Sequence, residues 1–111
     1  MAQEVDLPTE SSEMNLIAAV LQAIGHPTRL KILCFLGDEE KIVSDVLNHV
    51  GSTQSNISQH IQVLRRAGVL QSRREHNKVY CSIQTEEVLP LINQIKNIFC
   101  EKQTESGLIF I

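Results

Sequence analysis

Residues 52–83 read STQSNISQHIQVLRRAGVLQSRREHNKVYCSI, and this stretch decides the fold. Its first half carries apolar side chains at three- and four-residue intervals, the spacing of one face of an α-helix, at Ile57, Ile61 and Leu64. Ser52 or Thr53 is a suitable N-terminal cap for that helix, and Gly68 is a suitable stop. We therefore expect a helix that ends near Arg66.

The second half of the stretch contains two strand-like runs, 69–74 and 78–83. Only Glu75, His76 and Asn77 separate them, so we expect the runs to pair as a hairpin with a charged tip of two or three residues. A second short helix is expected just before the stretch, over about 43–49, with Gly51 at its end. Two short helices joined by such a turn are typical of a helix-turn-helix.

Apolar residues at helical spacing before and after the stretch 52–83 predict three further helices. The first covers about 14–24, the second starts at Pro27 and ends at Leu36, and the last starts from a cap at Thr85 and ends near Cys100. We expect one mainly helical domain with a small β-hairpin over residues 14–100. A flexible acidic arm at 1–13 and a short apolar tail at 101–111 flank it.

Length and composition exclude several classes of protein. A chain of 111 residues suits one domain, and no stretch has the run of about 20 apolar residues that crosses a bilayer. The N-terminus does not resemble a signal peptide, and three cysteines do not make a secreted disulfide framework. We expect a cytoplasmic protein with no membrane partner. No pattern typical of a catalytic or cofactor site is present, so we expect neither an enzyme nor a cofactor.

Charge is unevenly divided along the chain, whose net charge is −3. Residues 1–13 hold four acidic and no basic side chains, whereas residues 60–80 hold five basic and one acidic. A local basic segment matters more for binding phosphates than the overall charge does.

The expected helix at 54–66 exposes a polar face opposite its apolar one, and Ser and Gln side chains on such a face are suited to base edges and phosphates. The hairpin adds cations at its strands and polar groups at its tip, as a wing that reaches DNA would. These patterns make candidate DNA contacts of Ser52, Thr53, Gln54, Ser55, Ser58, Gln59, Gln62, Arg66, Arg73, Arg74, His76, Asn77 and Lys78.

The segments HPTRLKIL, at 26–33, and 52–83 closely resemble the ArsR/SmtB family of bacterial repressors, and the resemblance covers about 14–100. It implies a winged-helix homodimer that binds an inverted-repeat operator, and it adds His60 to the DNA-reading segment. It also implies that the first and last helices form the dimer interface. The apolar residues expected there are Leu16, Ile17, Val20, Leu21, Leu91, Ile92, Ile95 and Phe99.

Family members differ in the effector that they sense. The helix expected at 43–49 lacks the Cys-x-Cys pair of the arsenic and cadmium type, and the last helix lacks the His and Asp ligands of the zinc and nickel type. We therefore expect no metal site. Cys34 and Cys100 instead resemble the cysteine pair of the subgroup typified by HlyU, BigR and SqrR. That resemblance implies a disulfide or polysulfide bridge that weakens DNA binding in response to reactive sulfur or oxidants, whereas Cys81 is interpreted as packing.

Three other interpretations stay open from the sequence. One is a metal- or metalloid-responsive repressor of the ArsR type, which requires the three thiols to converge. Another is a constitutive or anti-silencing DNA-binding regulator with no thiol switch. The third is an interaction dimer without DNA binding, for which the hairpin cations would be dispensable.

Overall fold

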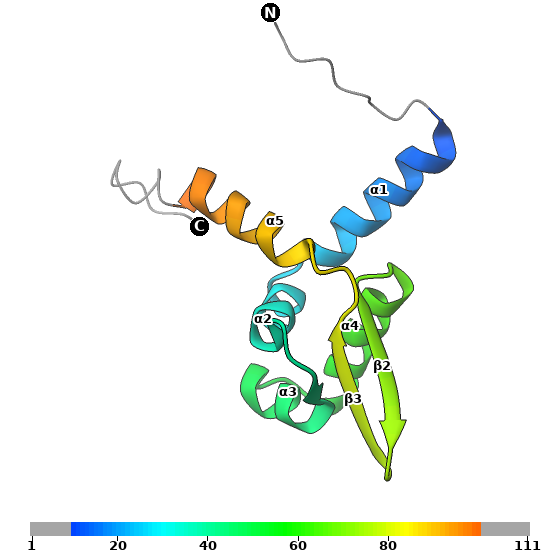
Figure 1. Ribbon diagram of the computed structural model, residues 1–111, viewed down its shortest axis with the longest axis vertical. Helices are drawn as coiled ribbons and strands as arrows, with labels where there is room; N and C mark the ends of the chain where they lie inside the picture. The colour runs from blue at the N-terminus through cyan, green and yellow to red at the C-terminus, as the bar shows by residue number, and fades with distance from the viewer. Residues whose placement is uncertain (1–9, 101–111) are drawn as a thin grey trace, which may run out of the picture.

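The computed structural model describes residues 10–100 (Figure 1). The expected tail at 101–111 and residues 1–9 of the expected arm lie outside the described residues. The elements in chain order are α1 Ser11–Ile24, α2 Pro27–Leu36, β1 Lys41–Ile42, α3 Val43–Val50, α4 Gln54–Arg66, β2 Leu70–Glu75, β3 Lys78–Ile83 and α5 Val88–Ile95, which a π-helical segment, Lys96–Cys100, extends. The expected mainly helical fold with a small antiparallel sheet is confirmed.

Local sequence signals set several helix ends as expected. Pro27 is the first residue of α2, where it needs no backbone hydrogen-bond partner. Thr53 caps α4, because its Oγ1 accepts a hydrogen bond of 3.1 Å from the backbone N–H of Asn56. Gly51 ends α3 with φ at 79°, a left-handed conformation that glycine adopts at little cost.

The core lies between α2, α4 and the sheet, and it holds α4 in one orientation. The apolar stripe of α4 is buried as expected, and it packs with buried residues of the other elements. Full burial of one leucine, isoleucine or valine side chain stabilises the fold by about 1.5–3 kcal/mol. The residues with at most 1% exposure are Ile32, Leu33, Leu36, Val46, Ile57, Leu64, Leu70 and Cys81. Because the apolar face of α4 is held inward, its polar face is held outward.

The sheet has three strands rather than the expected two, in the order β1-β3-β2. Strand β1 pairs antiparallel with β3, and two residues are too few to show the alternation by which a strand is found in a sequence. The hairpin of β2 and β3 has the shorter of the two expected tips. His76 and Asn77 form it with positive φ at both positions, as in the mirror-image turns that match the twist of paired strands.

Three further element boundaries differ from expectation. Helix α1 begins at Ser11, three residues earlier than predicted. The Thr85 hydroxyl donates a 2.9 Å hydrogen bond to the carbonyl oxygen of Gly68, so it does not cap α5, which begins at Val88. The regular turns of α5 stop at Ile95, and the remainder of the predicted helix is π-helical.

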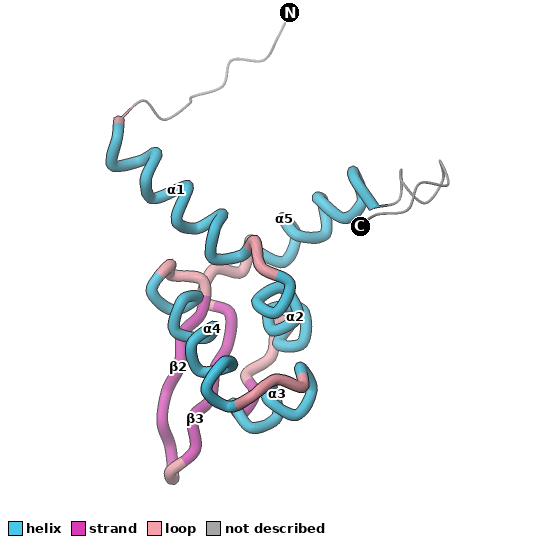
Figure 2. The backbone as a smooth tube through the Cα atoms, turned by 180° about the vertical axis from the view of Figure 1, so that it is seen from behind, coloured by secondary structure: helices cyan, strands magenta, loops and turns pink. Residues whose placement is uncertain are grey.

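Helices α1 and α5 leave the body of the domain at neighbouring points and diverge, as Figure 2 shows from the opposite side. Exposed apolar side chains lie on both helices and on the π-helical extension of α5, at Met14, Leu16, Ile17, Leu21, Leu91, Ile95, Ile98 and Phe99. Within residues 10–100 no helix has both the length and the hydropathy needed to cross a membrane.

Candidate nucleic-acid interface

A groove of about 580 Å³ lies between α4 and the hairpin, with the start of α3 at one end. The charged side chains that line it are Arg65, Arg74 and Lys78, and no acidic side chain is among its lining residues. Its lining residues are Ile42, Val43, Ser44, Leu47, Gln54, Ser58, Ile61, Gln62, Arg65, Ser72, Arg74, Asn77, Lys78 and Val79. The groove is therefore a basic surface with a helix along one wall and a β-ribbon along the other.

The structure brings six of the predicted DNA contacts together in this groove. They come from α4 and from the hairpin, and they are Gln54, Ser58, Gln62, Arg74, Asn77 and Lys78. Three others lie on exposed parts of α4 outside the groove, at Ser55, Gln59 and Arg66. Ser52 and Thr53 are used at the start of α4, since Thr53 caps the helix and the Ser52 hydroxyl lies 3.3 Å from the side-chain nitrogen of Asn56.

Neighbouring residues of β2 face opposite sides of the sheet, which separates Arg73 from Arg74. Arg74 lines the groove. Arg73 reaches over the Tyr80 ring toward Glu40, with its guanidinium carbon 4.5 Å from the ring centre. The sequence shows both cations but not this division between the two faces.

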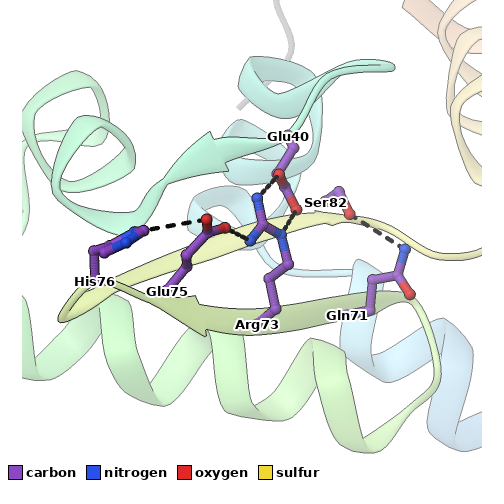
Figure 3. A network of polar contacts seen from close by, with 6 residues as sticks. All are labelled: Glu40, Gln71, Arg73, Glu75, His76 and Ser82. Carbon is purple, nitrogen blue, oxygen red and sulfur yellow. Dashed lines mark hydrogen bonds and ion pairs between the residues drawn. The ribbon is translucent and has the colours of Figure 1, made fainter.

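Arg73 is held by two carboxylates. Its Nε and Nη2 donate hydrogen bonds of 2.8 and 2.7 Å to the two oxygens of Glu40, and its Nη1 contacts Glu75 (Figure 3). The hydrogen bond from Arg73 keeps the pKa of Glu40 below its ordinary value, and the two carboxylates raise the pKa of Arg73. Arg73 therefore fastens the hairpin to the segment before β1. His76, at the exposed tip, lies 3.6 Å from Glu75.

His60 lies away from the groove, partly buried between α4 and the start of α2. Arg29 Nη1 is 3.1 Å from His60 Nδ1, and the rings of His26 and His60 have their centres 4.6 Å apart. Burial lowers the pKa of His60, and the nearby His26 and Arg29 lower it further. The family resemblance implied a place for His60 in the DNA-reading segment; the structure places its side chain against Arg29 and His26 at the start of α2.

The structure also adds groove residues that the sequence reasoning missed. Arg65 lines the groove and donates a 3.0 Å hydrogen bond to Gln62. It stands three residues after Gln62 and seven after Ser58, so the helical spacing already placed all three on one side of α4. Ser44 of α3 also lines the groove, and no local pattern marked it.

Two of the three cysteines are accessible. Cys34 and Cys100 are exposed. Cys81 is fully buried in β3, where burial and the neighbouring Glu40 carboxylate raise its pKa to about 11, so the interpretation of Cys81 as packing is confirmed. Among residues 10–100, no three His, Cys, Asp or Glu side chains are grouped so as to hold a metal ion.

Most of the residues predicted for the dimer interface are exposed apolar groups of α1, of α5 and of the π-helical segment that extends α5. Val20 and Ile92 are exceptions, because they are partly buried against the core of their own domain. The exposed members are Leu16, Ile17, Leu21, Leu91, Ile95 and Phe99.

Comparison with known proteins agrees with this arrangement. Residues 26–72 match the family described as bacterial regulatory protein, arsR family. The chain is 33% identical to the transcriptional activator HlyU of Vibrio cholerae, over 83% of this chain and 87% of that protein. It is 30% identical to the biofilm growth-associated repressor of Agrobacterium fabrum, over 87% of this chain and 83% of that protein.

Among solved structures, a homodimeric winged helix-turn-helix DNA-binding domain from Mycobacterium bovis superposes with a TM-score of 0.74 at 27% identity. The match covers 91% of this chain and 92% of that one. These relatives are transcriptional regulators rather than enzymes. The chain therefore belongs to the arsR family of bacterial regulatory proteins, and it is a DNA-binding transcriptional regulator with a winged helix-turn-helix fold.

Proposed function

We propose that the protein is a homodimeric repressor that binds an inverted-repeat operator with α4, its recognition helix, and with the hairpin, its wing. The observation that carries this proposal is the groove between α4 and the wing, which has three cations and no acidic lining residue. A major groove of B-DNA admits one α-helix, and cations beside such a helix contact the phosphates on either side.

The division of roles within the interface follows from side-chain chemistry. Gln54, Ser58 and Gln62 line the groove from α4 and have the donors and acceptors that read base edges. Arg74 and Lys78 line it from the wing and are suited to phosphate oxygens. Repression follows if the operator overlaps a promoter, because the bound dimer then excludes RNA polymerase.

Dimerisation is supported by the exposed apolar faces of α1 and α5. Apolar side chains gathered on an exposed face are typical of an interface with another protein. The similar Mycobacterium bovis domain is homodimeric. A two-fold dimer presents its recognition helices to successive major grooves, so the half-sites of the operator should be about one helical turn apart, 10–10.5 bp.

The experiment that tests this proposal is selection of duplexes from a random-sequence pool by the reduced protein. We expect an inverted repeat with one preferred separation of its half-sites. Fluorescence anisotropy on the selected duplex then gives the affinity, and sedimentation velocity gives the stoichiometry. Enrichment of single half-sites bound by a monomer, or no enrichment at all, would contradict the proposal that a dimer binds an inverted repeat.

We also propose that Cys34 and Cys100 switch DNA binding. Their exposure supports it, since both thiols are accessible to a dissolved oxidant whereas Cys81 is not. The Cys34 thiolate attacks dihydrogen disulfide to form a persulfide and releases one sulfide. The Cys100 thiolate then attacks the Cys34 Sγ and releases the second sulfide. Two thiols are thus oxidised to one disulfide while the polysulfide takes up two electrons.

Treatment with polysulfide should weaken binding to the selected duplex by about tenfold, which corresponds to a coupling of about 1.4 kcal/mol between the thiol site and DNA. Cys34→Ser and Cys100→Ser should each abolish the response. Cys81→Ala is the matched control and should keep it. Anisotropy measures the affinity, and mass spectrometry under non-reducing conditions identifies the bridge. A response that persists in Cys34→Ser would refute the switch.

A further inference from the structure

The corner between α1 and α2 brings three elements together at one side chain. Arg29, near the start of α2, donates hydrogen bonds through Nε to the carbonyl oxygen of Ala23 and through Nη2 to that of Gln22, the latter at 3.1 Å. Its third nitrogen, Nη1, is 3.1 Å from His60 Nδ1 on α4. One guanidinium therefore joins α1, α2 and α4.

The contacts to α1 have a clear physical basis. The last carbonyl groups of a helix have no partner within it, and the helix dipole makes that end favourable for a cation. The last turn of α1 has no basic side chain of its own, so Arg29 supplies this charge from α2. A Cβ atom at Gly25 would lie 2.9 Å from the carbonyl oxygen of Leu21, so the tight corner requires a glycine.

The contact to α4 fixes the protonation state of His60. A guanidinium has only donors, so His60 Nδ1 must accept, and the neutral ring must carry its proton on Nε2. His26 is constrained in the same way, because its Nδ1 accepts from the backbone N–H of Thr28. The titratable and charged groups that face His60 are His26 and Arg29, both at the start of α2. Helix α1 has no charged side chain after Glu13 and contributes only carbonyl oxygens.

We infer that Arg29 is a positioning residue for DNA binding. Through His60, Arg29 couples the dimer-forming helix α1 to the recognition helix α4. This inference rests on the proposed dimeric reading of an inverted repeat. Helix α1 carries part of the exposed apolar face, and α4 forms the wall of the DNA groove. A fixed link between them makes the separation of the two recognition helices follow the geometry of the dimer interface. Without the link, α4 can shift relative to the interface, and the preference for one half-site separation weakens.

The link also makes DNA reading dependent on pH, with a defined sign. Protonated His60 would present a donor and a positive charge to Arg29, so the contact exists only with the neutral ring. The pKa of His60 is lowered from its ordinary value of 6.5 by burial, His26 and Arg29. The contact is therefore complete above that value and is lost as the pH falls through the lowered pKa.

The test uses the duplex selected by the wild-type protein and two duplexes whose half-site separation differs by about one base pair in either direction. Arg29→Lys keeps a cation but cannot make all three contacts at once, and His60→Leu removes the acceptor. Each variant should lose affinity for the selected duplex by about fivefold to tenfold, and its affinities for the three duplexes should become nearly equal. Sedimentation velocity should still show a dimer.

His60→Asn is the matched variant, because its amide oxygen lies close to the position of Nδ1 and accepts from Arg29 but cannot be protonated. It should keep the preference for the selected separation. As the pH falls below 6.5 and through the lowered pKa of His60, the wild-type protein should lose that preference and His60→Asn should retain it. If His60→Leu does not fold, the pH profiles of the wild type and His60→Asn still test whether the Arg29–His60 contact sets the preferred separation.

The outcomes separate two failures. If no duplex is selected, the proposed dimeric reading of DNA fails. If a duplex is selected but Arg29→Lys and His60→Leu discriminate between separations as the wild type does, or if His60→Asn shows the wild-type pH profile, the inference about Arg29 is overturned.

Discussion

Replacing Arg65, Arg74 and Lys78 together by glutamine is expected to remove most of the DNA affinity. These are the charged residues that line the groove. Each phosphate contact releases condensed counterions, so the slope of log affinity against log salt should become shallower by about 0.9 for each lost contact, or about 2.7 for three. At low salt the loss should be about a hundredfold, at about 1 kcal/mol for each contact. Anisotropy titrations over a range of salt concentrations measure both quantities.

The matched control is Arg73→Gln, which removes the same charge from the adjacent position of β2. Because Arg73 is paired with Glu40 and Glu75 away from the groove, this variant should leave the salt dependence unchanged. Arg74→Gln alone should make the slope shallower by about 0.9. Equal changes in slope for Arg73→Gln and Arg74→Gln would show that overall charge, rather than the groove, governs binding.

Leu91→Glu is expected to dissociate the dimer. Leu91 is 46% exposed in the single chain and lies on the apolar face of α5 that we assign to the partner. A carboxylate buried there without a partner costs several kcal/mol, which exceeds what a small interface tolerates. Sedimentation equilibrium should show a monomer with unchanged secondary structure, and affinity for the inverted repeat should fall to that of one half-site. Leu21→Glu on α1 should behave in the same way.

Asn93→Glu adds the same charge to an exposed position of the same helix on its polar face, and it should remain dimeric. If Leu91→Glu and Asn93→Glu were both dimeric, the α5 face would not be the interface. The exposed apolar groups of α1 and α5 would then require another partner.

Much of the fold could be predicted because it depends on local spacing. The apolar repeat at Ile57, Ile61 and Leu64 predicts both α4 and its orientation, since only one face of the helix can enter the core. The cap at Thr53 and the stop at Gly51 depend only on their immediate neighbours. Strand β1 could not be found in this way, because two residues carry no period and their pairing with β3 is a long-range contact.

The sequence predicted which segments form the candidate site, but it did not predict how all of their side chains pair. The helical wheel and the basic run identified α4 and the wing, because each is a property of one segment. The role of Arg73 depends on Glu40, which is 33 residues earlier in the chain, and the role of His60 depends on Arg29, 31 residues earlier. Such pairs form only when the core brings distant segments together, so no local pattern marks them.

The two-residue turn at His76 and Asn77 limits how the length of the wing can change. Glu75 pairs directly with Lys78, so the ladder extends to the tip and contains no spare residue. Inserting one residue into β3 would shift its register against β2 and turn the side of β3 that holds the buried Cys81 away from the core. Inserting one residue into each strand at the tip would preserve the pairing and lengthen the ribbon by about 3.4 Å. Functional length variants of this wing should therefore differ from it by even numbers of residues.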